Sequence, residues 1–132
     1  MTAWIDTNVL VRHLTGDPPA MARRATRFLA AAAPGELLLA DLVLAEVVYV
    51  LESVYDLDRR AVAAAARAVV TFPAIAVDDP QLLLRAVEVY DNDRLDFAEA
   101  YLVASAERSG VRAVASFDKS VRRVTSVELI QP

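Results

Sequence analysis

Two aspartates stand where predicted strands end, at opposite ends of the chain. Asp6 follows the apolar run at 3–5, and Asp118 follows the strand-like run at 112–116. A carboxylate at the end of a buried strand costs free energy unless a partner neutralises it. The sequence contains no cysteine and one histidine, so a metal bound here must have oxygen ligands, which favours Mg²⁺ or Mn²⁺. We interpret the two strand ends as parts of one carboxylate pocket for a divalent cation.

Glu46 is the third candidate, and its surroundings make it the most informative. It lies in the middle of a helix predicted at 42–55 that is apolar on nearly all sides. Such a helix is usually buried, and a buried carboxylate must be paired, protonated or bound to metal. The alternative is an exposed stripe shared with Glu52, but these two residues lie about 120° apart around a helix. We therefore favour a functional role for Glu46.

Asp96 and Glu99 are three residues apart at the start of a helix predicted at 97–108, which places both on one face. The alternative is helix capping, with Asp96 as the N-cap and Glu99 completing a capping box. Taken alone, this pair favours the capping interpretation.

Polar neighbours of these acids have two open interpretations. Thr7 and Asn8 could orient Asp6 or contact phosphate, or they could only begin the first helix, for which Asn8 is the expected N-cap. Ser116 could support a ligand or be an ordinary loop hydroxyl. Trp4 is expected in the core.

Short apolar runs alternate with helical patterns along the whole chain. Strands are predicted at 3–5, 37–40, 74–77, 112–116 and 126–129. Helices are predicted at 7–15, 20–33, 42–55, 59–71, 81–90 and 97–108, with a polar loop at 91–94 and a short helix or turn at 119–124. This alternation predicts an α/β protein with a parallel sheet covered on both faces. Ligands of such sheets bind outside the carboxyl ends of the strands, where Asp6 and Asp118 are expected.

Length and charge set further bounds. The 132 residues predict one domain, 1–132, with no membrane span or signal peptide, and the lack of cysteine fits a cytoplasmic protein. The net charge of −4 differs from that of a classical nucleic-acid binder. Thirteen of the fourteen basic residues are arginines, which suit phosphate contacts, although each arginine cluster is more typical of a solvated helix face.

Taken together and in order, these segments resemble the PIN-domain family, and within it the VapC-type toxins of bacterial toxin–antitoxin pairs. The matching segments are 5–10, 44–47, 96–100 and 116–118, so the resemblance covers essentially the whole chain. It implies a three-layer α/β/α PIN-like fold with a short, mainly parallel central sheet. The family's acids correspond to Asp6, Glu46 and Asp118. The fourth corresponds to Glu99 by position, with Asp96 one turn earlier, and either could be the direct metal ligand.

The resemblance also implies an activity and partners. The chain is expected to be a Mg²⁺- or Mn²⁺-dependent endoribonuclease, with tRNA or another structured RNA as a candidate substrate. Asp6, Asp96 or Glu99, and Asp118 would hold the metal, and Glu46 would orient the attacking water or complete the metal shell. A homodimer and a VapB-type antitoxin partner are expected. Alternatives are a degenerate PIN-like binding module, a receiver-like Mg²⁺-binding signalling domain and a DNA nuclease with the same acids.

Overall fold

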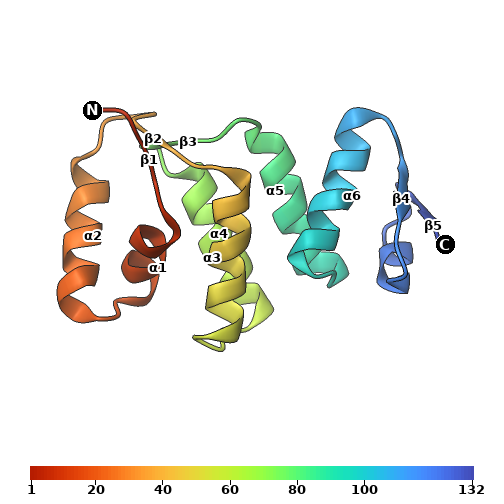
Figure 1. Ribbon diagram of the computed structural model, residues 1–132, viewed down its shortest axis with the longest axis horizontal. Coiled ribbons are helices and arrows are strands. Elements are labelled where there is room, and N and C mark those ends of the chain that lie inside the picture. The colour runs from red at the N-terminus through yellow and green to blue at the C-terminus, as the bar shows by residue number, and fades with distance from the viewer. The chain divides into compact units, whose positions relative to one another are not determined.

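The computed structural model describes all residues, 1–132, and the chain divides into two compact units, residues 1–78 and 79–132. The first unit has a three-stranded sheet in the order β1-β2-β3 with every pair parallel (Figure 1). Its strands are β1 (Ala3–Trp4), β2 (Leu37–Leu38) and β3 (Ile75–Ala76). Its helices are α1 (Thr7–Thr15), α2 (Pro19–Ala31), α3 (Asp41–Ser53) and α4 (Arg59–Thr71). The parallel pairing confirms the sequence prediction.

The second unit is built around two packed helices and a two-stranded parallel sheet. Its helices are α5 (Pro80–Glu88), the π-helical turn η1 (Val89–Asp93), α6 (Phe97–Ser109) and the 3₁₀ turn η2 (Lys119–Arg123). Its strands are β4 (Ala113–Ala115) and β5 (Glu128–Ile130). The predicted polar loop at 91–94 was therefore wrong for 91–93, because the helical turns of α5 continue as η1 before the backbone reverses at Arg94, which has a positive φ of 60°.

Helix ends follow the capping residues in the sequence. Asp58 begins α4 by accepting a hydrogen bond from the Ala61 N–H at 2.8 Å. Asp79 begins α5 in the same way through the Leu82 N–H, at 3.2 Å. Gly110 ends α6 in the left-handed conformation, φ 81°, which glycine adopts without steric cost. Local chemistry therefore fixes where α4 and α5 begin and where α6 ends.

Each unit has its own buried apolar side chains. The first unit buries one stripe of α3, formed by Leu44, Val47, Val48 and Leu51. The second unit buries Leu83 and Val87 of α5 together with Val103 of α6. Burying an aliphatic side chain of this size contributes about 1.5–3 kcal/mol, so these stripes are the main source of stability in each unit.

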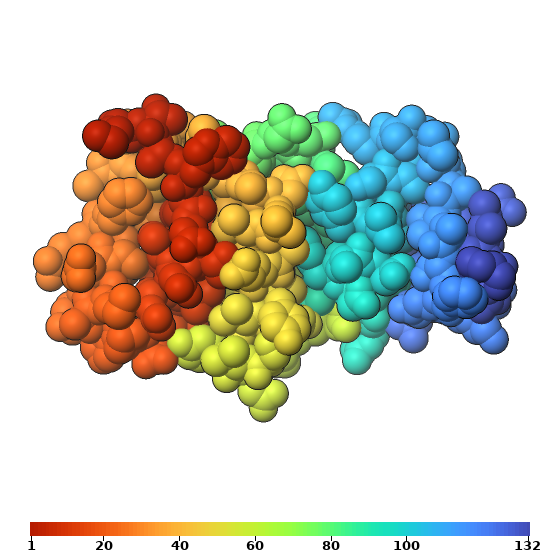
Figure 2. Space-filling view, viewed as in Figure 1, coloured from red at the N-terminus to blue at the C-terminus, as the bar shows by residue number.

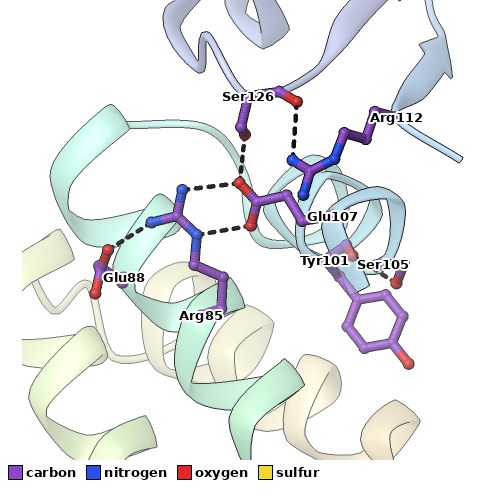
Figure 3. A network of polar contacts seen from close by, with 7 residues as sticks. All are labelled: Arg85, Glu88, Tyr101, Ser105, Glu107, Arg112 and Ser126. Carbon is purple, nitrogen blue, oxygen red and sulfur yellow. Dashed lines mark hydrogen bonds and ion pairs between the residues drawn. The ribbon is translucent and has the colours of Figure 1, made fainter. Parts of the chain in front are cut away.

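A polar network fastens the elements of the second unit to one another (Figure 3). Arg85 of α5 donates to both carboxylate oxygens of Glu107 on α6, at 2.8 and 3.0 Å, and also pairs with Glu88. Ser126, ahead of β5, donates its hydroxyl hydrogen to Glu107, and its backbone carbonyl accepts from Arg112. Two-pronged arginine–carboxylate contacts are among the stronger polar interactions in proteins. This network joins α5, α6 and the β4–β5 connection.

Candidate functional site

Asp6 lies just past the end of β1 and is also the N-cap of α1. Its Oδ1 accepts a hydrogen bond from the Thr7 N–H at 2.8 Å, and its side chain is exposed. The expectation that Asn8 caps this helix was wrong. The strand ends one residue earlier, so Asp6 reaches the first free N–H groups and Asn8 falls inside the helix, exposed. Asp6 therefore keeps one oxygen on the helix and has the other available for a ligand.

Thr7 is buried, with 3% of its surface exposed, and its hydroxyl oxygen has no hydrogen-bond partner. An unpaired buried hydroxyl costs roughly 1–3 kcal/mol, so its position next to Asp6 is not explained by packing alone. Thr7 is the only buried polar or charged residue in the protein.

Glu46 is exposed, which corrects the prediction that it is buried within α3. The helix is apolar in sequence on nearly all sides, yet only the stripe of Leu44, Val47, Val48 and Leu51 is buried. The opposite stripe, at intervals of three and four residues, is open to solvent and consists of Leu42, Glu46, Tyr49 and Ser53. Glu46 makes no hydrogen bond or ion pair there. The burial argument for Glu46 therefore fails, and its role is supported only by its place in the family pattern.

A hollow of about 400 Å³ lies at the carboxyl edge of the first sheet. It is lined by Trp4, Asp41 and Asp78 together with the strand-end residues that separate them. Trp4 is 72% exposed, which corrects its predicted place in the core, because its side chain faces this hollow. Asp41 and Asp78 were not predicted as site residues, although each follows a strand as Asp6 does. An aspartate before an apolar helical run is the expected N-cap, but Asp41 is the first residue of α3 and the N-cap position belongs to Ala40.

Glu99 is the only partly buried side chain among the candidate acids, since the other four are exposed. It lies in the first turn of α6, partly buried, and its Oε2 is buried without a hydrogen-bond partner. Burial raises the pKa of Glu99, and the negative charges of Asp96 and Asp118 raise it further, while the Ser116 hydroxyl works in the opposite direction. The structure therefore brings Asp96, Glu99, Ser116 and Asp118 together within the second unit.

Asp118 begins η2, where its Oδ1 accepts from the Ser120 N–H at 2.9 Å. Hydrogen bonds from Ser120 lower the pKa of Asp118, and the charge of Arg123 lowers it further. The Asp118 N–H donates to the Ser116 hydroxyl oxygen at 2.9 Å. Ser116 is thus in contact with the Asp118 turn and close enough to Glu99 to affect its pKa. These contacts place the Ser116 hydroxyl between two candidate acids.

Arg123 joins the two loops that carry the acids of the second unit. Its Nη1 donates to the backbone carbonyl of Arg94 at 3.0 Å and approaches that of Asp93 at 3.5 Å, just ahead of Asp96. Arg123 also lies in η2, five residues after Asp118. Sequence reasoning placed Arg122 and Arg123 on a solvated face, because nothing in the sequence indicates a contact with a carbonyl about thirty residues away.

Asp96 and Glu99 differ in what their side chains do. Asp96 is the N-cap of α6, with its Oδ1 accepting from the Glu99 N–H at 2.8 Å, so the capping interpretation is confirmed for Asp96. The Glu99 carboxylate keeps a buried oxygen free of any hydrogen bond.

The donor chemistry fits a hard divalent cation, although no group of three or more histidine or acidic side chains within either unit already has the geometry of a metal cage. Three carboxylates and a hydroxyl of the second unit supply only oxygen atoms, the ligands that Mg²⁺ and Mn²⁺ prefer. The unpaired oxygen of Glu99 and the mutual repulsion of its neighbours would both be relieved by a cation.

The PIN domain family matches residues 3–127, nearly the whole chain, and the protein belongs to that family. A comparison with curated proteins found no match to the chain. PIN domains are generally metal-dependent nucleases that act on RNA, and the match confirms the predicted fold class, a three-layer α/β/α fold with a short parallel sheet. The assignment argues against the receiver-like alternative. No helix combines the length and the apolar character that a bilayer span requires.

Proposed function

We propose that this PIN domain is a Mg²⁺- or Mn²⁺-dependent endoribonuclease and the toxin of a type II toxin–antitoxin pair, of the VapC type. One observation carries the nuclease proposal: Glu99 has a buried, unpaired carboxylate oxygen beside Asp96 and Asp118, in a cluster of oxygen donors where no basic side chain pairs with Glu99. Such a cluster is unfavourable in itself and becomes favourable when a divalent cation neutralises it.

The proposed ligands are Asp6, Glu99 and Asp118, with Asp96 as the helix cap that positions Glu99. Asp96 remains the alternative ligand through its second oxygen. Glu46 would orient the attacking water or complete the shell. Thr7, Asn8 and Ser116 would hold ligands or phosphate oxygens in place. Because the family match runs through both units, we propose that residues 1–132 act as a single PIN-like domain.

The chemistry required is hydrolysis of a phosphodiester. A bound divalent cation lowers the pKa of a coordinated water and neutralises charge on the phosphate oxygens. The carboxylates of this chain hold and orient that cation, and the capped helix ends at Asp6 and Asp96 fix the backbone from which two of them project.

Order along the chain supports the toxin subtype. The segments 5–10, 44–47, 96–100 and 116–118 follow the VapC pattern. Assignment to this subtype implies a cytoplasmic homodimer. It also implies a VapB-type antitoxin partner that covers the acidic residues. Co-expression with a small protein encoded beside this one, followed by measurement of RNA cleavage, tests the partner.

The decisive experiment compares purified wild type with Asp6→Asn on single-stranded RNA. Asn caps a helix as well as Asp does, so α1 is unaffected while a ligand charge is lost. Cleavage should fall by at least about 100-fold, and EDTA should abolish it in the wild type. Asp56→Asn is the matched control, because Asp56 is exposed with φ 53°, which Asn tolerates. Cleavage that persists in EDTA would refute the proposal.

A degenerate, binding-only PIN domain is the second candidate. It is favoured by the exposed position of Glu46, which makes no polar contact. Calorimetric titration with Mn²⁺ separates the two, since a degenerate site should bind the metal poorly. A DNA oligonucleotide of the same sequence as the RNA tests the DNA-nuclease alternative.

A further inference from the structure

Helices α1 and α2, at the red and orange end of the colour scale, pack side by side in the first unit (Figures 1 and 2). Their side chains line a surface groove of about 430 Å³. We call it the α1–α2 groove; its lining residues are Asn8, Val9, Arg12, Met21, Arg24, Ala25 and Phe28. Its volume is within the roughly 300–1,000 Å³ of small-molecule sites. No residue of this groove was used in the proposed catalytic chemistry except Asn8.

The charged residues of the groove are positive and uncompensated. Arg24 is exposed and makes no hydrogen bond or ion pair. Arg12 donates one bond to the backbone carbonyl of Asp17 at 3.3 Å, but its Nε is buried without a partner. Neither α1 nor α2 contains an acidic residue. The protein as a whole has a net charge of −4, so this helix pair, with unpaired arginines and no acids, differs from the rest of the chain. Its positive charge favours an anionic ligand.

The remaining lining is apolar and includes a half-exposed aromatic ring. Phe28 is 50% exposed and Met21 45% exposed, although large apolar side chains are normally buried. An exposed ring beside an unpaired arginine provides the two contacts that a single-stranded nucleotide uses, which are stacking of the base and pairing of the phosphate.

The groove also begins at the proposed metal ligand. Asn8 lines it and lies two residues after Asp6, in the first turn of α1. A single-stranded nucleic acid bound in this groove would therefore continue toward Asp6. Arg23 and Arg27, also exposed and unpaired on α2, line a separate hollow beside His13, so they add to the positive field of the helix pair and not to the groove itself.

We propose that the α1–α2 groove binds a nucleotide of single-stranded RNA that flanks the cleaved bond, with Arg24 and Arg12 on phosphate and the base on Phe28. The inference rests on the proposed function and adds where the substrate strand lies.

The test measures binding without cleavage, in the full-length Asp6→Asn protein with EDTA. The probe is a short fluorescein-labelled oligouridylate, followed by anisotropy at several salt concentrations. Arg24→Ala should weaken binding about five- to tenfold at low salt and reduce the salt slope by about 1. Arg60→Ala, which removes an exposed arginine from α4, is the matched control and should change affinity less than twofold.

Substitutions of Phe28 separate stacking from general apolar contact. Phe28→Leu should weaken RNA binding about tenfold without changing the salt slope, whereas Phe28→Tyr, which keeps a ring, should bind like the parent. A protein segment docking in the groove would tolerate leucine. Unchanged RNA affinity and slope in both Arg24→Ala and Phe28→Leu would overturn the inference, even if the wild type cleaves RNA. RNA binding that depends on Arg24 and Phe28 in a protein that never cleaves would support the groove and refute the nuclease proposal.

Discussion

Helix α6 carries two partly buried glutamates with opposite surroundings at its two ends. Glu107 holds Arg85 through both oxygens and accepts from Ser126, and hydrogen bonding from Arg85 lowers its pKa. Glu99 has a buried oxygen without a partner, and burial raises its pKa. Glu107 is thus structural, because Arg85 supplies its positive partner. Glu99 is a candidate metal ligand, because no side chain of the protein supplies one.

The largest effect should separate the two glutamates by activity. Glu99→Gln should reduce RNA cleavage by at least about 100-fold, because it removes a proposed metal ligand. Glu107→Gln should leave cleavage within a few-fold of wild type at a temperature where both proteins are folded. Initial rates on one RNA substrate, with circular dichroism to confirm folding, measure both. An equal loss of cleavage activity in the two variants would contradict the proposal that Glu99 and Glu107 have different roles.

The stability of the folded protein should depend on Glu107 more than on Glu88, the other partner of Arg85. Glu107→Ala should lower the free energy of unfolding by about 2 kcal/mol, since it leaves a partly buried Arg85 without its main partner. Glu88→Ala removes the more exposed partner of the same arginine and should cost less than about 1 kcal/mol. Urea unfolding followed by circular dichroism gives both values. A Glu88 variant as damaged as the Glu107 variant would contradict this assignment.

Asp96 tests whether capping and charge can be separated beside Glu99. Asp96→Ala should lower stability by about 1 kcal/mol because α6 loses its N-cap, whereas Asp96→Asn keeps the cap and should be nearly neutral. If Asp96→Asn nevertheless abolishes cleavage, its second oxygen is a metal ligand and the choice of Glu99 alone is wrong.

The smallest effect concerns pH. A carboxylate whose pKa is raised in the folded state is destabilising when ionised, so in EDTA the Glu99→Gln protein should melt a few degrees above wild type at pH 7. This gain should shrink as the pH falls through the raised pKa, and should vanish below the ordinary value of 4.5. Glu107, with a lowered pKa, should stabilise the protein above 4.5 and lose that effect as the pH falls through its folded value. Melting curves across this range test both signs.

Local signals in the sequence were sufficient for most helices and strands. Helix α4 was predicted at its observed bounds, 59–71, because its ends are set by local contacts such as the Asp58 cap. Four strands were predicted at the right place but too long, since the apolar runs extend past the paired residues. The last strand was predicted at 126–129 and lies at Glu128–Ile130. The parallel pairing followed from the alternation of strands and helices.

The exposure of individual side chains and the contacts between distant residues could not be predicted from the sequence. Glu46 was predicted to be buried because both stripes of α3 are apolar, and only the packing decides which stripe is covered. Trp4 was predicted in the core because it is apolar, and again only the packing shows that it is exposed. The pair Arg85–Glu107 spans 22 residues and has no local signal. The sequence could not separate Asp96 from Glu99, because caps and metal ligands use the same residue types. In the structure they differ in that Asp96 caps α6 and one Glu99 oxygen is buried without a partner.

Arg123 has a consequence for the order of events in metal binding. By donating to the carbonyls at 93–94 while lowering the pKa of Asp118, it keeps two mutually repelling acidic loops in register without any ion. The second unit therefore would not have to fold around the proposed cation. If the site binds metal as proposed, these loops would keep their arrangement when the metal is removed and returned.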